Sequence, residues 1–416
     1  MTPGAGADSE KDRFLRSTVT RHTGNHPVLG VAVSGGGDSL ALLHLLAGQP
    51  GLRAVTVDHG LRAEAAAEAA AVGATCSRIG VPHDILQWHW NGTGNLSDAA
   101  RRGRIVLMAE WARQHGLTAV ALGHTADDQA ETFLMRLARG SGVDGLSGMA
   151  RQRLAEGVIW LRPLLDITRT DLRAYLQRRG ASWFDDPTND DATYQRVRAR
   201  AAMAHLGPLG ITTQRLVDTA RSLAMAREVA QLAALQAARQ IARIEAGDVV
   251  FDREGLLQLP LETQGRLTAH AIGWIASVVY RPRRASLELA LAAVALRKRH
   301  TIGGCLLIPT LRQIRVTREL RAVAQTRRPV GAVWDARWCV SGPVSNGLEI
   351  GALGADGLAQ IVDWRRTGLP RSTLLASPAV WHGLDLVAAP LAGLPGDWQA
   401  CLHQDADTFF MSLLSH

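Results

Sequence analysis

Short apolar runs alternate with helical repeats of apolar and polar residues between positions 28 and 138. The runs have the length and the β-branched composition of buried strands, and the repeats have the three- and four-residue spacing of amphipathic helices. Strands that alternate with helices form βαβ units, so this pattern predicts a doubly wound parallel α/β sheet with helices on both faces. The expected strands are 28–33, 53–57, 81–88 and 118–122, and the expected helices are 40–46, 62–78, 97–114 and 126–138.

Polar or glycine-rich segments follow three of these four strands. The segments are 34–39, 58–62 and 123–132. The carboxyl ends of parallel strands meet at one edge of the sheet, and ligands of open α/β sheets bind at that edge. We therefore expect a ligand site that is built from these three segments.

After residue 138 the composition and the periodicity of the chain change. Residues 139–200 are rich in Gly, Asp and Arg, with one expected helix near 168–179, whereas Ala, Leu and Ile recur at helical spacing over about 213–300. Short segments rich in Val, Trp and Gly follow Pro329, which resembles a linker. The expected parts are a flexible lead-in (1–26), a domain that carries the ligand site (27–212), a helical domain (213–328) and a small C-terminal α+β domain (329–416).

Composition makes the chain a globular protein with a basic surface. Hydrophobic residues are 47% and charged residues 20% of the chain, which excludes a disordered protein. The net charge is +8, and Lys11 and Lys298 are the only lysines, so 44 of the 46 basic residues are Arg. A GC-rich genome would explain much of the preference for Arg over Lys. The positive excess itself favours a polyanionic partner, nucleic acid first and a membrane surface second.

Cysteine usage and hydropathy predict a soluble cytoplasmic protein. The four cysteines, at positions 76, 305, 339 and 401, form no C-x-x-C pair, which argues against a disulfide framework or a metal cluster. No run of 18 apolar residues is present, and the N-terminus has no apolar leader segment. We therefore expect a reducing compartment and no membrane partner.

The glycine-rich segment 34–39 reads Ser-Gly-Gly-Gly-Asp-Ser and joins a strand to a helix, which is the geometry that presents backbone N–H groups to a phosphate. It is not the dinucleotide fingerprint, because Leu40 stands where a third Gly is needed, and it has no Lys for a Walker A motif. The pattern S-G-G-x-D-S resembles the pyrophosphate loop of ATP pyrophosphatases, although a plain strand-to-helix turn is the alternative. Asp38 would repel phosphates unless a metal lies between them, so we predict that it binds Mg²⁺.

Further motifs extend this resemblance to one family. Together with the loop, they are similar to the tRNA(Ile)-lysidine synthetases, strongly over 28–200 and more weakly beyond. One departure is that Val197 follows Arg196 where the family often has Asn, which leaves the role of 196–200 open. The matching segments are 58–62 (Asp-His-Gly-Leu-Arg), 123–132 (Gly-His-Thr-Ala-Asp-Asp-Gln-Ala-Glu-Thr), 139–142, 145–146, 162–165 (Arg-Pro-Leu-Leu) and 186–189 (Asp-Pro-Thr-Asn).

The resemblance implies an adenine nucleotide α-hydrolase-like fold and a two-step reaction. ATP would adenylate the C2 oxygen of the wobble cytidine, position 34 of the CAU anticodon of tRNA(Ile), and the ε-amino group of free L-lysine would then displace AMP to give lysidine. The C2 oxygen is a poor leaving group until AMP is attached, and the lysine ammonium must lose a proton before it attacks. ATP and Mg²⁺ are therefore the expected cofactors, and tRNA(Ile) and L-lysine are the expected partners.

Four polar residues recur at helical spacing just beyond the fourth strand. His124, Asp127, Asp128 and Glu131 stand at i, i+3, i+4 and i+7 and share one face of a helix near its N-terminus. We predict that Asp128 and Glu131 hold the lysine ammonium and that His124 lies beside the reacting base or phosphate. Acidic residues that complement the helix dipole, or a solvated helix face, are the alternatives.

Other candidate site residues are distributed over the catalytic domain. Arg101 and Arg104, three residues apart on a helix, could clamp ATP phosphates, and Arg139 in the loop after the acidic helix could contact substrate. The alternatives are solvated arginines and a plain connecting loop. Trp88 and Trp90 could stack on a base, although we expect them to pack in the core or at a partly exposed edge. The expected ATP-binding residues are Ser34, Gly35, Gly36, Gly37, Asp38, Ser39, Asp58 and His59, and the expected catalytic ones are Asp38, Arg101, Arg104, His124, Asp128 and Glu131.

The basic runs 297–300 and 327–328 are candidate phosphate contacts, so we expect both C-terminal domains to bind the tRNA. Solvated arginines or the surface of a homodimer are the alternatives.

Two other functions compete with the ligase. A tRNA thiolating enzyme with the same loop would need reactive cysteines, usually in C-x-x-C pairs, which are absent. A non-catalytic nucleotide-binding protein would not need both the intact loop and the acidic motif.

Overall fold

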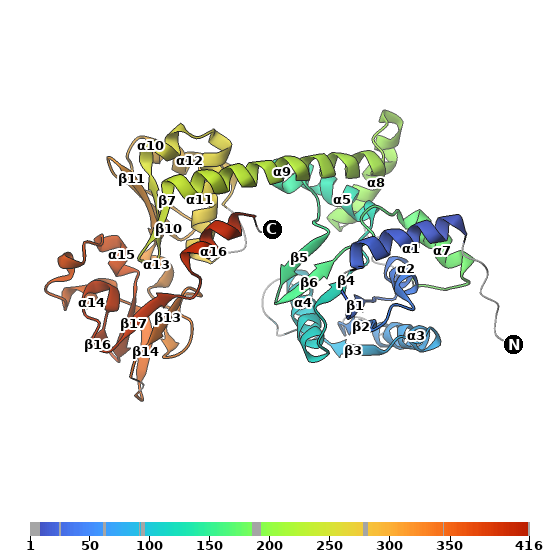
Figure 1. Ribbon diagram of the computed structural model, residues 1–416, viewed down its shortest axis with the longest axis horizontal. Coiled ribbons are helices and arrows are strands. Elements are labelled where there is room, and N and C mark those ends of the chain that lie inside the picture. The colour runs from blue at the N-terminus through green and yellow to red at the C-terminus, as the bar shows by residue number, and fades with distance from the viewer. Residues whose placement is uncertain are drawn as a thin grey trace. The chain divides into compact units, whose positions relative to one another are not determined.

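A computed structural model describes residues 9–24, 26–60, 64–90, 92, 96–184, 193–277, 282–343 and 345–414. The chain divides into two compact units, residues 1–227 and 228–415, which we describe separately (Figure 1). Among the described residues, no helix is both long enough and apolar enough to cross a membrane.

The first unit is built on a six-stranded sheet, which confirms the predicted doubly wound α/β fold. The strands are parallel except for the one at the β5 edge, which is antiparallel to its neighbour. The chain leaves β1 in one direction to β2 and later returns to β4 on the other side, so the carboxyl ends of β1 and β4 flank the switch point where such sheets bind ligands. In spatial order the strands are β3 (His83–Gln87), β2 (Arg53–Asp58), β1 (Leu29–Ala32), β4 (Ala119–Ala121), β6 (Val158–Leu161) and β5 (Gln152–Ala155).

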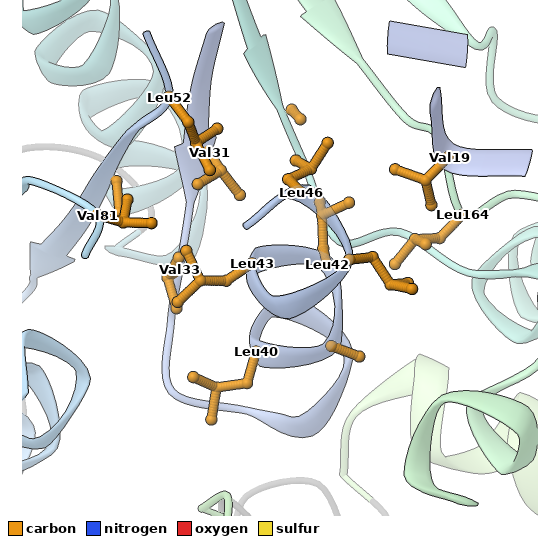
Figure 2. Packing of buried hydrophobic residues seen from close by; sticks show 14 of the residues in the cluster. Val19, Val31, Val33, Leu40, Leu42, Leu43, Leu46, Leu52, Val81 and Leu164 are labelled. Atoms are coloured by element: carbon orange, nitrogen blue, oxygen red, sulfur yellow. The ribbon is translucent and has the colours of Figure 1, made fainter. Parts of the chain in front are cut away.

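Helices cover the sheet of the first unit, and α2 is the most deeply buried of them. Its apolar residues are enclosed on all sides, between strand residues such as Val31 and the helices on its outer side. Figure 2 shows Val33 on one side of this helix and Val19 and Leu164 on the other. The helices are α1 (Glu10–Thr23), α2 (Gly37–Leu46), α3 (Ala65–Arg78), α4 (Leu96–Gln114), α5 (Ala126–Leu137), α6 (Val143–Leu146), α7 (Arg169–Arg178), α8 (Gln195–Leu206), the 3₁₀ turn η2 (Gly207–Leu209) and α9 (Thr213–Ile241), which continues into the second unit.

The prediction of a flexible lead-in over 1–26 is wrong for most of that segment, because residues 10–23 form α1. Ser9 caps this helix by accepting a hydrogen bond from the Asp12 N–H at 3.1 Å. Leu15 and Val19, four residues apart, are buried in the core beneath it. The segment looked polar because only this narrow stripe faces the protein, and because its buried Asp12 is neutralised by Arg178, which lies far away in the sequence.

The glycine-rich stretch 139–200 also contains more structure than predicted. Besides the expected helix, now α7, it contains the hairpin of β5 and β6 and most of α8. The hairpin turns at Glu156 and Gly157, both of which have positive φ. Strands of four residues with a two-residue turn carry too little periodicity to be recognised in a polar stretch.

The region predicted to be helical, 213–328, is helical over much of its length but also contains a sheet that the sequence did not predict. Its helices pack on a five-stranded antiparallel sheet in the order β7-β8-β11-β10-β9. The hairpin of β7 and β8 turns at Ala246 and Gly247, both with positive φ, between segments that we expected to be helical. The elements are β7 (Ala242–Glu245), β8 (Asp248–Asp252), α10 (Arg253–Gln258), α11 (Leu261–Ala276), α12 (Arg284–Ala295), β9 (His300–Ile302), β10 (Cys305–Pro309) and β11 (Gln313–Arg318).

The last part of the chain contains short strands and short helices, as its pattern predicted. A four-stranded sheet has the order β12-β14-β15-β16, and β13 pairs with β17. The elements are α13 (Leu320–Val323), β12 (Arg328–Pro329), β13 (Trp338–Ser341), β14 (Leu348–Ala352), α14 (Gly354–Ala359), η3 (Trp364–Thr367), α15 (Arg371–Leu375), β15 (Pro378–His382), β16 (Asp385–Ala388), η4 (Pro390–Ala392), β17 (Gln399–Leu402), α16 (Ala406–Met411) and η5 (Ser412–Leu414).

Buried contacts join the first and last parts of the second unit. Asp248 is buried and accepts hydrogen bonds from the Arg315 guanidinium at 2.9 Å and from the Thr373 hydroxyl at 2.5 Å. Phe409 of α16 is fully buried against the rings of His270 and Trp274 on α11. Both contacts connect residues that lie before Pro329 with residues that lie after it.

Candidate functional site

The loop between β1 and α2 has the geometry of an anion site. Gly36 is the N-cap residue of α2, and no side chain caps the N–H groups of its first turn. The Ser39 hydroxyl fixes the loop, because it accepts from the Ser34 N–H at 3.1 Å and donates to the Gly36 carbonyl at 2.9 Å. Gly35 has a φ of +87°, which favours glycine at that position. The free N–H groups and the helix dipole together favour a phosphate here.

The end of β4 lies against this loop. A Cβ atom on Gly123 would lie 3.0 Å from the Ser39 backbone, closer than most Cβ contacts, so this approach favours glycine. The next residues form the N-terminus of α5, where Thr125 is the N-cap. The contact therefore brings the acidic helix to the loop at 34–39.

Asp128 has a structural role in the helix cap and a second contact in the acidic cluster. Its Oδ2 atom accepts hydrogen bonds from the Thr125 N–H at 2.8 Å and from the Thr125 hydroxyl at 2.9 Å, which completes a capping box. Its Oδ1 atom instead accepts a bond from the Arg169 guanidinium at 2.7 Å. The helix cap therefore accounts for one oxygen of this carboxylate.

Arg169 connects the acidic residues of the site to each other. Its guanidinium bonds to Asp38 at 3.2 Å, to Asp128 at 2.7 Å and to Glu131 at 2.6 Å. Its backbone N–H donates to Asp127 at 2.8 Å. One cation thus holds carboxylates from the loop and from the acidic helix in a single cluster.

Our sequence reasoning did not identify Arg169. One signal was present, because Arg169 is the first residue of α7, and a cation at a helix N-terminus opposes the helix dipole. An arginine in that position needs acidic neighbours from elsewhere in the fold.

Two further arginines surround Glu131, which is 2% exposed. They lie four residues apart on α8, with Arg200 Nε 3.0 Å and Arg196 Nε 3.4 Å from the Glu131 carboxylate. Segment 196–200, whose role the sequence left open, therefore faces the acidic helix. Glu131 contacts three guanidinium groups in this arrangement.

Burial and charge set the protonation of the acidic cluster. Burial, reinforced by Asp128 and Asp127 and opposed by Arg169, raises the pKa of Asp38 to about 6. Burial also disfavours the charge of Asp128, but Arg169 and the Thr125 N–H outweigh it and keep the pKa of Asp128 below its usual value. Asp38 is therefore a carboxylate whose charge changes near pH 6.

His124 is a neutral imidazole in this site. Burial, together with the charges of Arg162, Arg196 and Arg104, lowers the pKa of His124 to about 4. Its Nδ1 atom is buried and has no hydrogen-bond partner among the described residues. A neutral ring with an unpartnered nitrogen can donate or accept one hydrogen bond to a bound ligand.

A second group of residues in the first unit carries unbalanced positive charge. Burial, with Arg101 beside it, lowers the pKa of Arg104, and burial with Arg153 and Arg101 nearby lowers the pKa of Arg162 to about 10. Within the described ranges, no carboxylate forms an ion pair with Arg101, Arg104 or Arg162. Arg101 is exposed, whereas Arg104 and Arg162 are half-buried, and half-buried guanidinium groups without an anion favour the binding of one.

Two of the predicted ATP-binding residues, Asp58 and His59, make contacts outside the acidic cluster. Asp58 accepts bonds from the Gly60 N–H at 2.8 Å and from Gln87 at 3.2 Å, as expected for a strand-end turn. His59 lies edge-on to the buried Trp88, and burial and Arg104 lower its pKa.

Arg139 donates to the side chain of Gln195 and not to the acidic cluster. Residues 61–62 and 186–189, which carried part of the family resemblance, lie outside the described residues.

A magnesium ion fits this site only together with a phosphate ligand. In the part of the chain that the structure describes, no group of three or more His, Cys, Asp or Glu side chains could hold a metal. Asp38 alone offers a carboxylate beside the anion-binding loop. Mg²⁺ is commonly held by one or two carboxylates and the oxygens of substrate phosphates, so the donors present are sufficient for a metal that arrives with ATP.

The chain is similar in sequence to one family model and to curated relatives. The family model of the PP-loop domain matches residues 9–206. A tRNA(Ile)-lysidine synthase from Ruegeria pomeroyi is 50% identical over 394 residues, which are 93% of this chain and 94% of the relative. Another from Methylobacterium nodulans is 41% identical over 318 residues, 72% of this chain and 92% of the relative.

Among solved structures, a U34-tRNA thiolase from Methanococcus maripaludis matches 52% of this chain and 80% of its own. Its TM-score is 0.45 and its identity 18%. This likeness is too low to bear on function.

Proposed function

The chain belongs to the tRNA(Ile)-lysidine synthase family, and we infer from this membership that it is an ATP-dependent ligase. Its reaction joins free L-lysine to C2 of cytidine 34 in the CAU anticodon of tRNA(Ile). ATP first adenylates the C2 oxygen and releases pyrophosphate, and the lysine ε-amine then displaces AMP. The observation that carries this proposal is the contact of the phosphate-binding loop with the acidic helix at the ends of β1 and β4.

We assign the phosphates of ATP to the loop and to the unpaired arginines. Ser34, the three glycines and Ser39 shape the loop, and the N–H groups at the start of α2 would bind one phosphate. Arg101, Arg104 and Arg162 would stabilise the negative charge that moves onto the phosphates as pyrophosphate leaves. Mg²⁺, held by Asp38 and phosphate oxygens, would supply further charge neutralisation.

We assign Asp128 and Glu131 to the ammonium group of lysine, although Arg169 already contacts both. A substrate ammonium can replace a guanidinium in such a cluster because both are cations that donate hydrogen bonds to carboxylates. Arg169 is therefore the internal counter-ion that the lysine displaces. Its departure from Asp38 would also free that carboxylate for the metal.

We assign His124 a hydrogen bond to the reacting base or phosphate. A ring with a pKa of about 4 is too weakly basic to hold the proton of an alkylammonium, whose usual pKa is about 10.4. The neutral ring can still direct its unpartnered nitrogen at an oxygen atom of the substrate.

We propose that the exposed basic residues of the second unit bind the tRNA. Arg297, Lys298 and Arg299 are all exposed at the end of α12, and Arg371 is exposed at the start of α15. Other arginines of this unit are structural, such as Arg318, which forms a two-bond pair with Asp335. A homodimer that uses this surface is the competing proposal. We expect the reaction to take place in the cytoplasm, where its tRNA substrate is found.

The thiolating alternative finds no support in the site. Cys76 is the only cysteine of the first 227 residues, and it is fully buried. Burial raises the pKa of the Cys76 thiol to about 11, so it is protonated at neutral pH and a poor nucleophile.

The assay that tests the ligase follows AMP release from ATP with total tRNA and each amino acid in turn. We expect lysine to drive AMP release and lysidine to appear in the tRNA(Ile) digest. The proposal is wrong if a sulfur donor and not lysine drives AMP release, or if AMP appears without any change in the tRNA.

A further inference from the structure

Two cysteines face each other across the short ladder of β13 and β17. Cys339 and Cys401 are directly opposed in its antiparallel register. Opposed residues of an antiparallel pair have Cα atoms about 4.5 to 5.5 Å apart. This lies within the span of about 4.4 to 6.8 Å that a disulfide bridges. Both thiols are free, Cys401 is exposed and Cys339 is half-buried.

A histidine at the end of the ladder lies beside one of these thiols. His403 directly follows the last residue of β17, and its backbone N–H donates to the Arg337 carbonyl at 2.7 Å, which holds it beside the ladder. Its Nδ1 atom is 3.7 Å from the Cys339 sulfur, and the Cys401 sulfur is 3.7 Å from the Cys339 carbonyl oxygen. The imidazole is placed to accept the proton of the Cys339 thiol, and the thiolate is the reactive form.

The other two cysteines provide an internal contrast. Cys76 and Cys305 are fully buried in the cores of the first and second units. Burial raises the pKa of Cys76 to about 11 and that of Cys305 to about 12. Neither thiol is available to an oxidant while the protein is folded.

We propose that Cys339 and Cys401 are a redox modification site, which forms a reversible disulfide on exposure to a low-molecular-weight disulfide such as oxidised glutathione. The Cys339 thiolate attacks one sulfur of the oxidant and releases one glutathione thiolate, which leaves a mixed disulfide at Cys339. The Cys401 thiolate then attacks the Cys339 sulfur and releases the second glutathione. The two protein thiols lose two electrons and two protons, and one oxidised glutathione becomes two reduced ones.

This cross-link would join the two ends of the segment 339–401, which we call the C-terminal module. Strands β14, β15 and β16 all lie between Cys339 and Cys401 along the chain. A disulfide that closes this loop restricts the unfolded chain and stabilises the folded module. Adenylation chemistry needs neither cysteine, because both lie in the second unit and the phosphate-binding loop lies in the first.

The test oxidises the full-length chain with oxidised glutathione and maps its peptides by mass spectrometry without reduction. We expect a Cys339–Cys401 link within one chain, reversed by reduced glutathione, with Cys76 and Cys305 unmodified. The variant Cys401→Ser should retain glutathione on Cys339, because the second step is blocked. The variant His403→Asn should react several-fold more slowly and still form the link.

A thermal melt provides a second readout. The oxidised wild-type chain should melt at a higher temperature than the reduced chain, and the double variant Cys339→Ser with Cys401→Ser should show no such shift. Circular dichroism confirms that the variants are folded. Separate glutathione adducts on both cysteines, a link between two chains, or modification of Cys305 at the same rate would each overturn the proposal.

Discussion

Replacing Arg169 by Met tests whether one guanidinium holds the acidic cluster together. The substitution keeps an unbranched side chain of similar length and removes the bonds to Asp38, Asp128 and Glu131. Glu131 keeps its contacts with two arginines of α8, so the loss falls on the two aspartates.

The expected loss of stability follows from the charges that remain. Removing one member of a buried ion pair costs about 3 to 5 kcal/mol, because the other member stays buried and uncompensated. The Arg169 side chain is 20% exposed, and solvent screening reduces the loss toward the lower end of that range. We therefore expect the free energy of unfolding to fall by about 3 kcal/mol at pH 8.

The loss should depend on pH in a definite direction. The folded pKa of Asp38 is already raised to about 6, so its charge costs stability as pH rises from about 4 through 6. Without Arg169 that pKa rises further, and the cost extends to higher pH. The variant should therefore lose more stability at pH 8 than at pH 5.

Hydrogen exchange of the α5 and α7 amides, at both pH values, measures this loss without assuming two-state unfolding of a two-unit chain. The matched control is Arg113→Met, which removes an exposed arginine of the same unit. Lysine kinetics add a functional readout, because a displaced counter-ion predicts a lower KM for lysine in Arg169→Met. Equal protection of wild type and variant at both pH values would refute the reasoning.

Three further predictions concern the metal, the lysine and the tRNA. Asp38→Asn should abolish AMP formation, measured as AMP release from ATP. It should also raise the free energy of unfolding at pH 8, measured by urea melts, by up to about 3 kcal/mol, because a pKa of about 6 in place of 3.8 makes the buried charge of Asp38 costly. Asp128→Asn and Glu131→Gln should raise the KM for lysine more than that for ATP in steady-state assays. Arg297→Ala with Arg299→Ala should lower the salt slope of tRNA binding by about two units, seen in titrations at several salt concentrations.

Each of these predictions has a contrasting outcome. Normal AMP release by Asp38→Asn with Mg²⁺ would remove the metal role of that residue. An unchanged lysine KM in both acidic-helix variants would remove the ammonium site. For the tRNA, Arg284→Ala is the matched control, because Arg284 is exposed but paired with Glu288. A salt slope that falls equally in this control would show a general charge effect and not a phosphate contact.

The parts of the site that the sequence predicted are segments that directly follow buried parallel strands. The loop at 34–39 and the helix that begins at Ala126 each follow a recognisable buried strand. Parallel strands bring such ends together whatever the side chains are, so their proximity could be predicted.

The parts that were missed depend on contacts over long distances in the sequence. Arg169 meets Asp38 from 131 positions away, and no local pattern records that distance. The same holds for α1, whose buried Asp12 depends on Arg178. In the second unit, the hairpin that turns at Gly247 was missed because it stands between strong helical repeats.

The buried bond between Thr373 and Asp248 has a consequence for how this chain can change over generations. The hydroxyl comes from after Pro329 and the carboxylate from before it, and Phe409 packs on α11, which also precedes Pro329. A recombination event that exchanged only the segment after Pro329 would have to supply a hydroxyl and an aromatic ring at matching places. Otherwise it would leave a buried acid short of a donor and a hole in an apolar core. The final segment is therefore expected to be inherited with the 228–328 region as a single heritable piece.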